Sequence, residues 1–181
     1  WGIESIWDRY DIIVPDPAPS LGLLSMSAMH AANAVIVTMP PAIYDVFSTR
    51  SFATMMTRIA EMLEKYLGSV DYKFVRLMVT RLDESSEIQV KLAEFLPKVL
   101  GHDMLRHSIR KTAALDRSGM RGRTVYEIRS SDTDASGKRV IDRRTLNRAR
   151  AHFNSANEEI LQLIRMSWPT HLAAMKDKGE I

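Results

Sequence analysis

The strongest constraint on the fold of this chain is the alternation of continuous apolar runs with amphipathic segments. Residues 34–39 form a β-branched run that ends at two prolines, and residues 72–80 are expected to form another strand. Both are followed by segments whose apolar residues recur every three or four positions, as on one face of a helix. Parallel strands are buried on both faces and are joined by helices. The sequence therefore predicts an α/β fold in which helices flank a mostly parallel sheet on both faces.

Four further elements are expected around these runs. Residues 12–14 are expected to form a buried strand, and Ser20 is a good N-cap for the helix that follows. Ser86 and Gln89 have the spacing of a capping box, which predicts the start of another helix. The short stretch at residues 102–105 is a candidate for one more strand.

The segment after the two prolines is expected to be a helix with a stripe of Met and aromatic residues on one face. The stripe consists of Phe52, Met55, Ile59, Met62 and Tyr66. Such stripes are far more often part of a core than of a binding surface, so we expect these side chains to be buried. Gly68 is the expected end of this helix.

Composition divides the chain into four parts. Residues 1–128 are expected to form part of an α/β domain, in which residues 106–128 are rich in loops, and residues 129–142 are expected to form a polar, Gly-containing loop. Residues 143–169 are expected to form a long C-terminal helix, which ends at a proline. Residues 170–181 are expected to be a flexible tail.

Composition also excludes several classes of site. The chain has 181 residues, 45% of them hydrophobic, which is enough for one domain with a core. It has no Cys, so disulfides and Cys-ligated metal sites are excluded. It has no run of about 18 apolar residues, so no membrane span is expected.

The net charge of +3 conceals a basic block at residues 106–150. This block contains 13 Lys or Arg and 5 Asp or Glu, a net charge of +8, so the rest of the chain carries −5. Clustered positive charge in such a protein indicates contact with an anionic partner, most often nucleic acid. The alternative is a solvated surface of a loop and a helix.

A carboxylate, Asp16, follows the apolar residues 12–14 and lies between two prolines. In nucleotide-binding α/β domains, a carboxylate at the carboxyl end of a central strand lies beside the phosphates and their Mg²⁺. The alternative is a strand that ends in an Asx-type turn. The spacing of these residues leaves both interpretations open.

Four segments resemble ParA-type partition ATPases, and among these the RepA proteins of repABC plasmids. The stretch YDIIVPDPAPSLG at residues 10–22 resembles a family segment that ends in a Pro-rich turn, although Pro15 stands where the family has an aliphatic residue. Residues 23–41, 112–128 and 145–168 resemble the following helix and strand, a late loop that ends in TVYE, and the terminal helix. The resemblance implies part of a P-loop NTPase-like domain of the deviant Walker type with a long C-terminal helix.

The resemblance implies ATP and Mg²⁺ as cofactors and assigns roles to particular residues. Asp16 matches the acidic residue that holds Mg²⁺ through water at the catalytic site. Arg81 follows a strand at the carboxyl edge of the sheet, where residues of ParA-like folds approach the adenine base. The basic residues implied to bind DNA without sequence specificity are Arg110, Lys111, Arg121 and Arg123. They would contact phosphates, so binding should tolerate any sequence and weaken with salt.

The resemblance also implies how such a protein works in the cell. It implies a cytoplasmic, nucleoid-associated protein that dimerises around ATP and has no membrane partner. A ParB- or RepB-type partner, bound at a centromere-like site, would stimulate hydrolysis. The cycle would move plasmid copies apart before division.

The phosphate-binding motif G-x-x-x-x-G-K-[ST] is absent from the chain. The chain begins with Trp1 rather than Met, so we expect a C-terminal segment of a longer protein whose upstream part carries the phosphate loop. Without that loop we expect no ATP hydrolysis by this segment alone. The alternative from another functional class is a non-catalytic module that binds DNA or a partner, such as an operon autorepressor.

Overall fold

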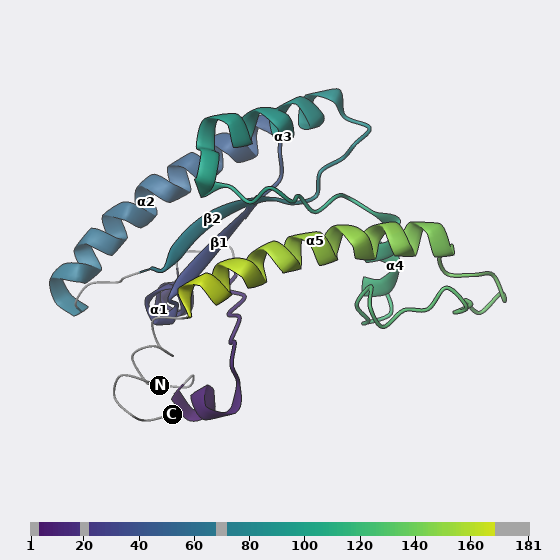
Figure 1. Ribbon diagram of the computed structural model, residues 1–181, viewed down its shortest axis with the longest axis horizontal. Coiled ribbons are helices and arrows are strands. Elements are labelled where there is room, and N and C mark those ends of the chain that lie inside the picture. The colour runs from purple at the N-terminus through teal and green to yellow at the C-terminus, as the bar shows by residue number, and fades with distance from the viewer. Residues whose placement is uncertain (1–3, 19–21, 68–71, 169–181) are drawn as a thin grey trace.

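The computed structural model describes residues 4–18, 22–67 and 72–168 of the chain (Figure 1). The expected tail at residues 170–181 lies outside this part. The elements are, in chain order, the 3₁₀ helix η1 (Glu4–Arg9), α1 (Leu23–Ala31), β1 (Ala34–Met39), α2 (Ile43–Leu67), β2 (Phe74–Val79), α3 (Glu87–Leu100), the 3₁₀ helix η2 (Gly101–Asp103), α4 (Ala113–Gly119) and α5 (Arg143–Ser167).

β1 and β2 form a parallel pair, in register from Ala34 opposite Phe74 to Met39 opposite Val79. The helix α2 connects them, because parallel neighbours need a crossover connection. In the view of Figure 1, α2 and α3 lie on one side of the strands and α5 lies on the other. The structure confirms the predicted α/β class, with a parallel sheet between helices and a long C-terminal helix.

A third segment lies beside β2, but it forms only a short contact with the strand. Met104 makes an isolated parallel bridge to Leu77, and the N–H of Leu105 donates to the Leu77 carbonyl at 2.8 Å. The strand predicted at residues 102–105 is therefore reduced to one bridge, because the 3₁₀ helix η2 occupies the first part of this stretch.

Buried apolar side chains form two clusters. The sheet cluster, which joins the strands to α3, consists of Met39, Val79, Leu82, Leu96 and Met104. The loop cluster, which joins α4 and the following loop to the first half of α5, consists of Ala114, Val125, Ile128, Val140, Ile141, Leu146 and Ala149. The basic block is therefore folded over a core of its own.

The strand predicted at residues 12–14 is wrong. These residues are extended, but they are not assigned to any strand of the described chain, and Val14 is 82% exposed. A strand forms only where a neighbouring strand receives its hydrogen bonds, and Pro15 and Pro17 have no N–H to donate to a sheet. The predicted N-cap Ser20 lies outside the described residues.

The core position predicted for the Met and aromatic stripe of α2 is wrong where its side chains are described. Phe52 is 36% exposed and Met55 is 38% exposed. A helix of 25 residues is about 38 Å long, whereas a six-residue strand spans about 20 Å, so much of α2 has no sheet to pack against. Near its start, Val46 does pack against the sheet cluster. The side chains of Ile59, Met62 and Tyr66, together with Gly68, lie outside the described part.

Side-chain caps fix the first turns of α3 and α5. The hydroxyl of Ser86 accepts a hydrogen bond from the Gln89 N–H at 3.5 Å, which confirms the predicted cap. The Gln89 side chain accepts from the N–H of Asp83 at 3.0 Å, so this capping box reaches back beyond Ser86. At α5, Asp142 accepts from the Thr145 N–H at 2.8 Å. Both caps orient loops that carry charged residues.

Candidate functional site

The carboxyl end of β2 is bordered by a segment of the basic block. The N–H of Ile109 donates to the Val79 carbonyl at 2.9 Å, and the N–H of Leu82 donates to the Ile109 carbonyl at 3.1 Å. The N–H of Lys111 then donates to the Leu82 carbonyl at 2.9 Å. These bonds place Arg110 and Lys111, two of the predicted DNA contacts, beside the end of the strand.

Arg81 lies in the turn that leaves β2 at the same place. Its φ of 55° is in the left-handed region, which is uncommon for a residue other than glycine. Its side chain is exposed, and no ion pair to it occurs among the described residues. Backbone strain of this kind often occurs at functional sites. The role of Arg81 beside a nucleotide stays a prediction.

Acidic side chains from the same turn bind both neighbouring cations. Glu84 forms ion pairs with Arg110 and with Arg148 of α5, the latter at 2.6 Å. Asp83 lies 3.4 Å from the Nζ of Lys111. An exposed ion pair such as Glu84–Arg148 contributes about 0.2–1 kcal/mol and is screened by salt. Arg110 and Lys111 are therefore held loosely, and a stronger anion can compete for them.

His152 lies one turn after Arg148 on α5. Its Nε2 is buried and has no hydrogen-bond partner among the described residues. Burial lowers the pKa of His152, and the nearby charges of Arg110 and Arg148 lower it further, while Glu84 acts in the opposite direction. The imidazole therefore belongs to the same cluster of charged groups.

The other two predicted DNA contacts, Arg121 and Arg123, form a second group after α4. Arg123 lies 3.5 Å from the carboxylate of Asp132, and Arg121 donates to the Arg117 carbonyl at 3.5 Å. The pKa of Asp134 is lowered mainly by hydrogen bonds from its own turn, with a smaller contribution from the charge of Arg121. Among the described residues, these two groups of predicted DNA contacts therefore have different acidic partners.

Glu159 of α5 holds the loop that carries the first pair. Its carboxylate accepts hydrogen bonds from the N–H groups of Arg106 at 2.8 Å and His107 at 3.0 Å. The Nδ1 of His107 lies 2.7 Å from the same carboxylate. Burial raises the pKa of Glu159, but these hydrogen bonds outweigh burial, so its pKa lies below the usual value of 4.5.

Substitution of Glu159 by Gln is expected to lower the free energy of unfolding by about 1–3 kcal/mol at neutral pH, because an amide cannot accept all these bonds. Since the folded-state pKa is depressed, the contribution of Glu159 is present at neutral pH and is lost as the pH falls below 4.5 through the folded-state pKa. Urea unfolding at both ends of this range measures the effect. The neighbouring exposed residue provides the control: Glu158→Gln should change stability by less than about 0.5 kcal/mol. Equal losses in the two variants would contradict the assignment.

In the described part of the chain, Asp16 has no hydrogen bond or ion pair with these groups. Asp16 is exposed and follows the extended, unpaired residues 12–14. Within the described ranges there is no group of three His, Asp or Glu side chains that could hold a metal ion. The chain also lacks a G-x-x-x-x-G-K-[ST] loop.

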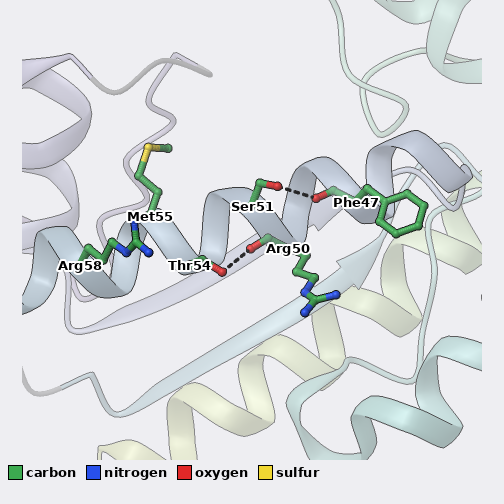
Figure 2. A pocket seen from close by; sticks show the side chains of 6 residues that line it. All are labelled: Phe47, Arg50, Ser51, Thr54, Met55 and Arg58. Atoms are coloured by element: carbon green, nitrogen blue, oxygen red, sulfur yellow. Dashed lines mark hydrogen bonds between the residues drawn. The ribbon is translucent and has the colours of Figure 1, made fainter.

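A surface hollow of 410 Å³ lies along α2 and is lined by Phe47, Arg50, Ser51, Thr54, Met55 and Arg58 (Figure 2). All six residues belong to α2, so no second element lines the hollow within the described residues. The hydroxyls of Ser51 and Thr54 donate to the carbonyls of Phe47 and Arg50 one turn earlier, at 3.1 and 3.0 Å. These hydroxyls are thus engaged by the helix itself, and the hollow shares no residue with the basic block.

Comparison with known proteins gives consistent matches. A family model described as an AAA domain matches residues 2–69. The chain is 30% identical over 166 residues to "Putative replication protein A" of Rhizobium rhizogenes, which covers 92% of this chain and 39% of that protein. It is 29% identical over 140 residues to "Protein SopA" of Escherichia coli (strain K12), which covers 75% of this chain and 34% of that protein.

These matches support a ParA-family plasmid partition protein. A more distant match is the "Sporulation initiation inhibitor protein Soj" of Bacillus subtilis (strain 168), 22% identical over 130 residues, which covers 71% of this chain and 49% of that protein. The chain spans 39% of the length of the two replication proteins that it matches, from Rhizobium rhizogenes and Sinorhizobium fredii. The activity of a whole relative is therefore only a proposal for this chain. None of the described helices is long and apolar enough to cross a membrane.

Sequence reasoning missed several residues of the candidate site. Arg148 and His152 are four residues apart in a predicted helix, and this spacing alone places them on one face. Nothing in the sequence shows that this face meets Glu84 and Arg110. The role of Glu159 also depends on a contact across 53 residues, which no local pattern reveals.

Proposed function

We propose that this chain works as part of a ParA-type partition ATPase and provides a surface that binds DNA phosphates without sequence specificity. The observation that carries the proposal is the basic block, which has a net charge of +8 and is folded over its own core. Its predicted contacts are side chains of Arg and Lys, which bind phosphate oxygens rather than base edges. The family relationship to partition proteins supports this function.

Two features support phosphate contact by both pairs of cations. Arg110 and Lys111 are exposed enough to meet a ligand, and their acidic partners bind them only through surface ion pairs. Arg121 and Arg123 lie in an exposed turn after α4. The two pairs would therefore contact separate phosphates along one duplex.

ATP and Mg²⁺ are proposed as ligands of the assembled protein, not of this chain alone. The phosphate loop would come from residues that this chain does not contain. Asp16 would then face the metal through water, and Arg81, which is exposed at the end of β2, would lie near the base. Residues of this chain supply the edge of such a site, so we expect no ATP turnover by the chain alone.

The cellular role follows from the family relationship. We propose a cytoplasmic protein that associates with the nucleoid, forms a dimer with ATP, and is stimulated by a ParB- or RepB-type partner at a centromere-like site. Plasmid copies would be separated by this cycle. The second candidate is a non-catalytic DNA-binding module or operon autorepressor, which is favoured by the absence of the phosphate loop from the chain.

DNA binding by the purified chain tests the proposal. Two duplexes of equal length and unrelated sequence should bind with affinities that agree within about twofold, because phosphate contacts carry no sequence information. Fluorescence anisotropy at low salt measures both. Binding to an operator duplex that exceeds the other by about 1,000-fold would favour the autorepressor instead.

A further inference from the structure

Glu84 is the meeting point of two arginines that come from distant parts of the chain. Arg110 lies 26 residues further along, in the segment beside the end of β2, and Arg148 lies 64 residues further along, on α5. One carboxylate oxygen accepts a hydrogen bond from Arg110, and the other accepts from the Nη2 of Arg148 at 2.6 Å. Two guanidinium groups from separate elements thus converge on a single anion.

The surroundings of this anion have an excess of positive charge and an unused polar atom. Two guanidinium groups face one carboxylate, which leaves a net charge of about +1 on the three side chains. His152, four residues after Arg148, has a buried Nε2 without a hydrogen-bond partner among the described residues. A buried polar atom without a hydrogen-bond partner costs free energy.

A phosphate group resembles a carboxylate in the properties that matter here. It is anionic and presents two or more free oxygens, and arginines bind it with short, charge-assisted hydrogen bonds. We propose that Arg110 and Arg148 form a binding site for a phosphate group, and that Glu84 fills this site as an internal competitor until a phosphate replaces it. The proposal rests on the proposed function for its main source of phosphate, the DNA backbone. Free phosphate is the second source.

The three side chains are accessible to such a ligand. Glu84 is 42% exposed, Arg110 35% and Arg148 62%. The carboxylate can therefore turn into water while the guanidinium groups stay where they are. Surface ion pairs are weak and are screened by salt, so the exchange needs no large rearrangement.

Glu84→Gln tests the competition, because it removes the competing charge and keeps the size of the side chain. Glu87→Gln is the matched control: Glu87 is an exposed acid three residues away, and its partner is Lys91 at 2.6 Å. Binding of duplex DNA to the full chain is measured by fluorescence anisotropy at low salt. Glu84→Gln should bind about tenfold more tightly than the parent, whereas Glu87→Gln should gain less than about twofold. The gain should disappear when Arg110→Ala and Arg148→Ala are added.

Equal gains in Glu84→Gln and Glu87→Gln would overturn the proposal, because any lost acid would then have the same long-range effect. Inorganic phosphate provides a second readout, through the NMR signals of the Arg110 and Arg148 side-chain N–H groups. These signals should shift at a lower phosphate concentration in Glu84→Gln than in the parent, because the variant lacks the carboxylate that competes with phosphate. If DNA does not bind, but phosphate shifts the NMR signals at lower concentration in Glu84→Gln than in the parent, the proposed function is wrong. The phosphate site is then still supported, and free phosphate is its ligand. If phosphate leaves them unchanged in Glu84→Gln, the site itself is rejected.

Discussion

Substitution of Arg150 by Ala is expected to lower the free energy of unfolding by about 2–4 kcal/mol. The Arg150 side chain donates to three backbone carbonyls of the loop before α5: Val125 at 2.9 Å, Tyr126 at 3.2 Å and Ile128 at 2.8 Å. Val125 and Ile128 belong to the loop cluster, so these bonds join the loop and α5 over their common core. Alanine leaves all three carbonyls without this donor, and the hydrogen bonds to Val125 and Ile128 are partly buried. Urea unfolding followed by circular dichroism measures the loss.

Two variants make this result specific to the guanidinium group. Arg144→Ala removes the same charge from an exposed position of α5 and should change stability by less than about 0.5 kcal/mol. Arg150→Lys keeps the charge but cannot reach three carbonyls at once, so it should lie between the parent and Arg150→Ala. A loss in Arg150→Ala no larger than that in Arg144→Ala would show that the three hydrogen bonds do not hold the loop.

The double substitution Arg121→Ala and Arg123→Ala is expected to weaken DNA binding about tenfold at low salt. Both side chains lie in the exposed turn after α4, where Asp132 is the acidic partner of Arg123. Each lost phosphate contact should reduce the slope of log K against log salt by about 0.9, so the pair should reduce it by about 1.8. Anisotropy titrations over a salt series measure both quantities.

Arg165→Ala is the control for this pair, since it removes one positive charge from the last turn of α5, outside the basic block. It should leave the salt slope unchanged and reduce affinity less than about twofold. Circular dichroism should show that all variants keep the helix content of the parent. A salt slope that does not change in the double variant would mean that Arg121 and Arg123 are solvated surface residues without contact to DNA.

Local patterns predict this fold where an element depends on its own residues. The run at residues 34–39 is a strand with the predicted bounds, and the long helix starts at the predicted Arg143. The prediction fails where an element needs a neighbour. Residues 12–14 have a strand-like sequence but no described strand to pair with, and the stripe of α2 extends beyond the six-residue strands that would cover it. Periodicity shows which face of a helix is apolar, but it does not show what covers that face.

The candidate site shows the same division. The basic block is visible in the sequence because charge accumulates over 45 consecutive positions, from residue 106 to residue 150. The contacts that organise it are long-range: Glu84 reaches Arg110 and Arg148, and Arg150 reaches Val125 and Ile128. No spacing rule connects such residues, because their approach depends on how α5 packs across the loop cluster.

The most direct test of the central claim is the salt dependence of DNA binding by the unaltered chain. Four phosphate contacts, from Arg110, Lys111, Arg121 and Arg123, predict a linear fall of log K with log salt and a slope of about −3 to −4. The slope should be the same for two duplexes of unrelated sequence. No binding at about 50 mM salt, or a slope near zero, would contradict the claim that this part of a ParA-family protein binds DNA through its phosphates.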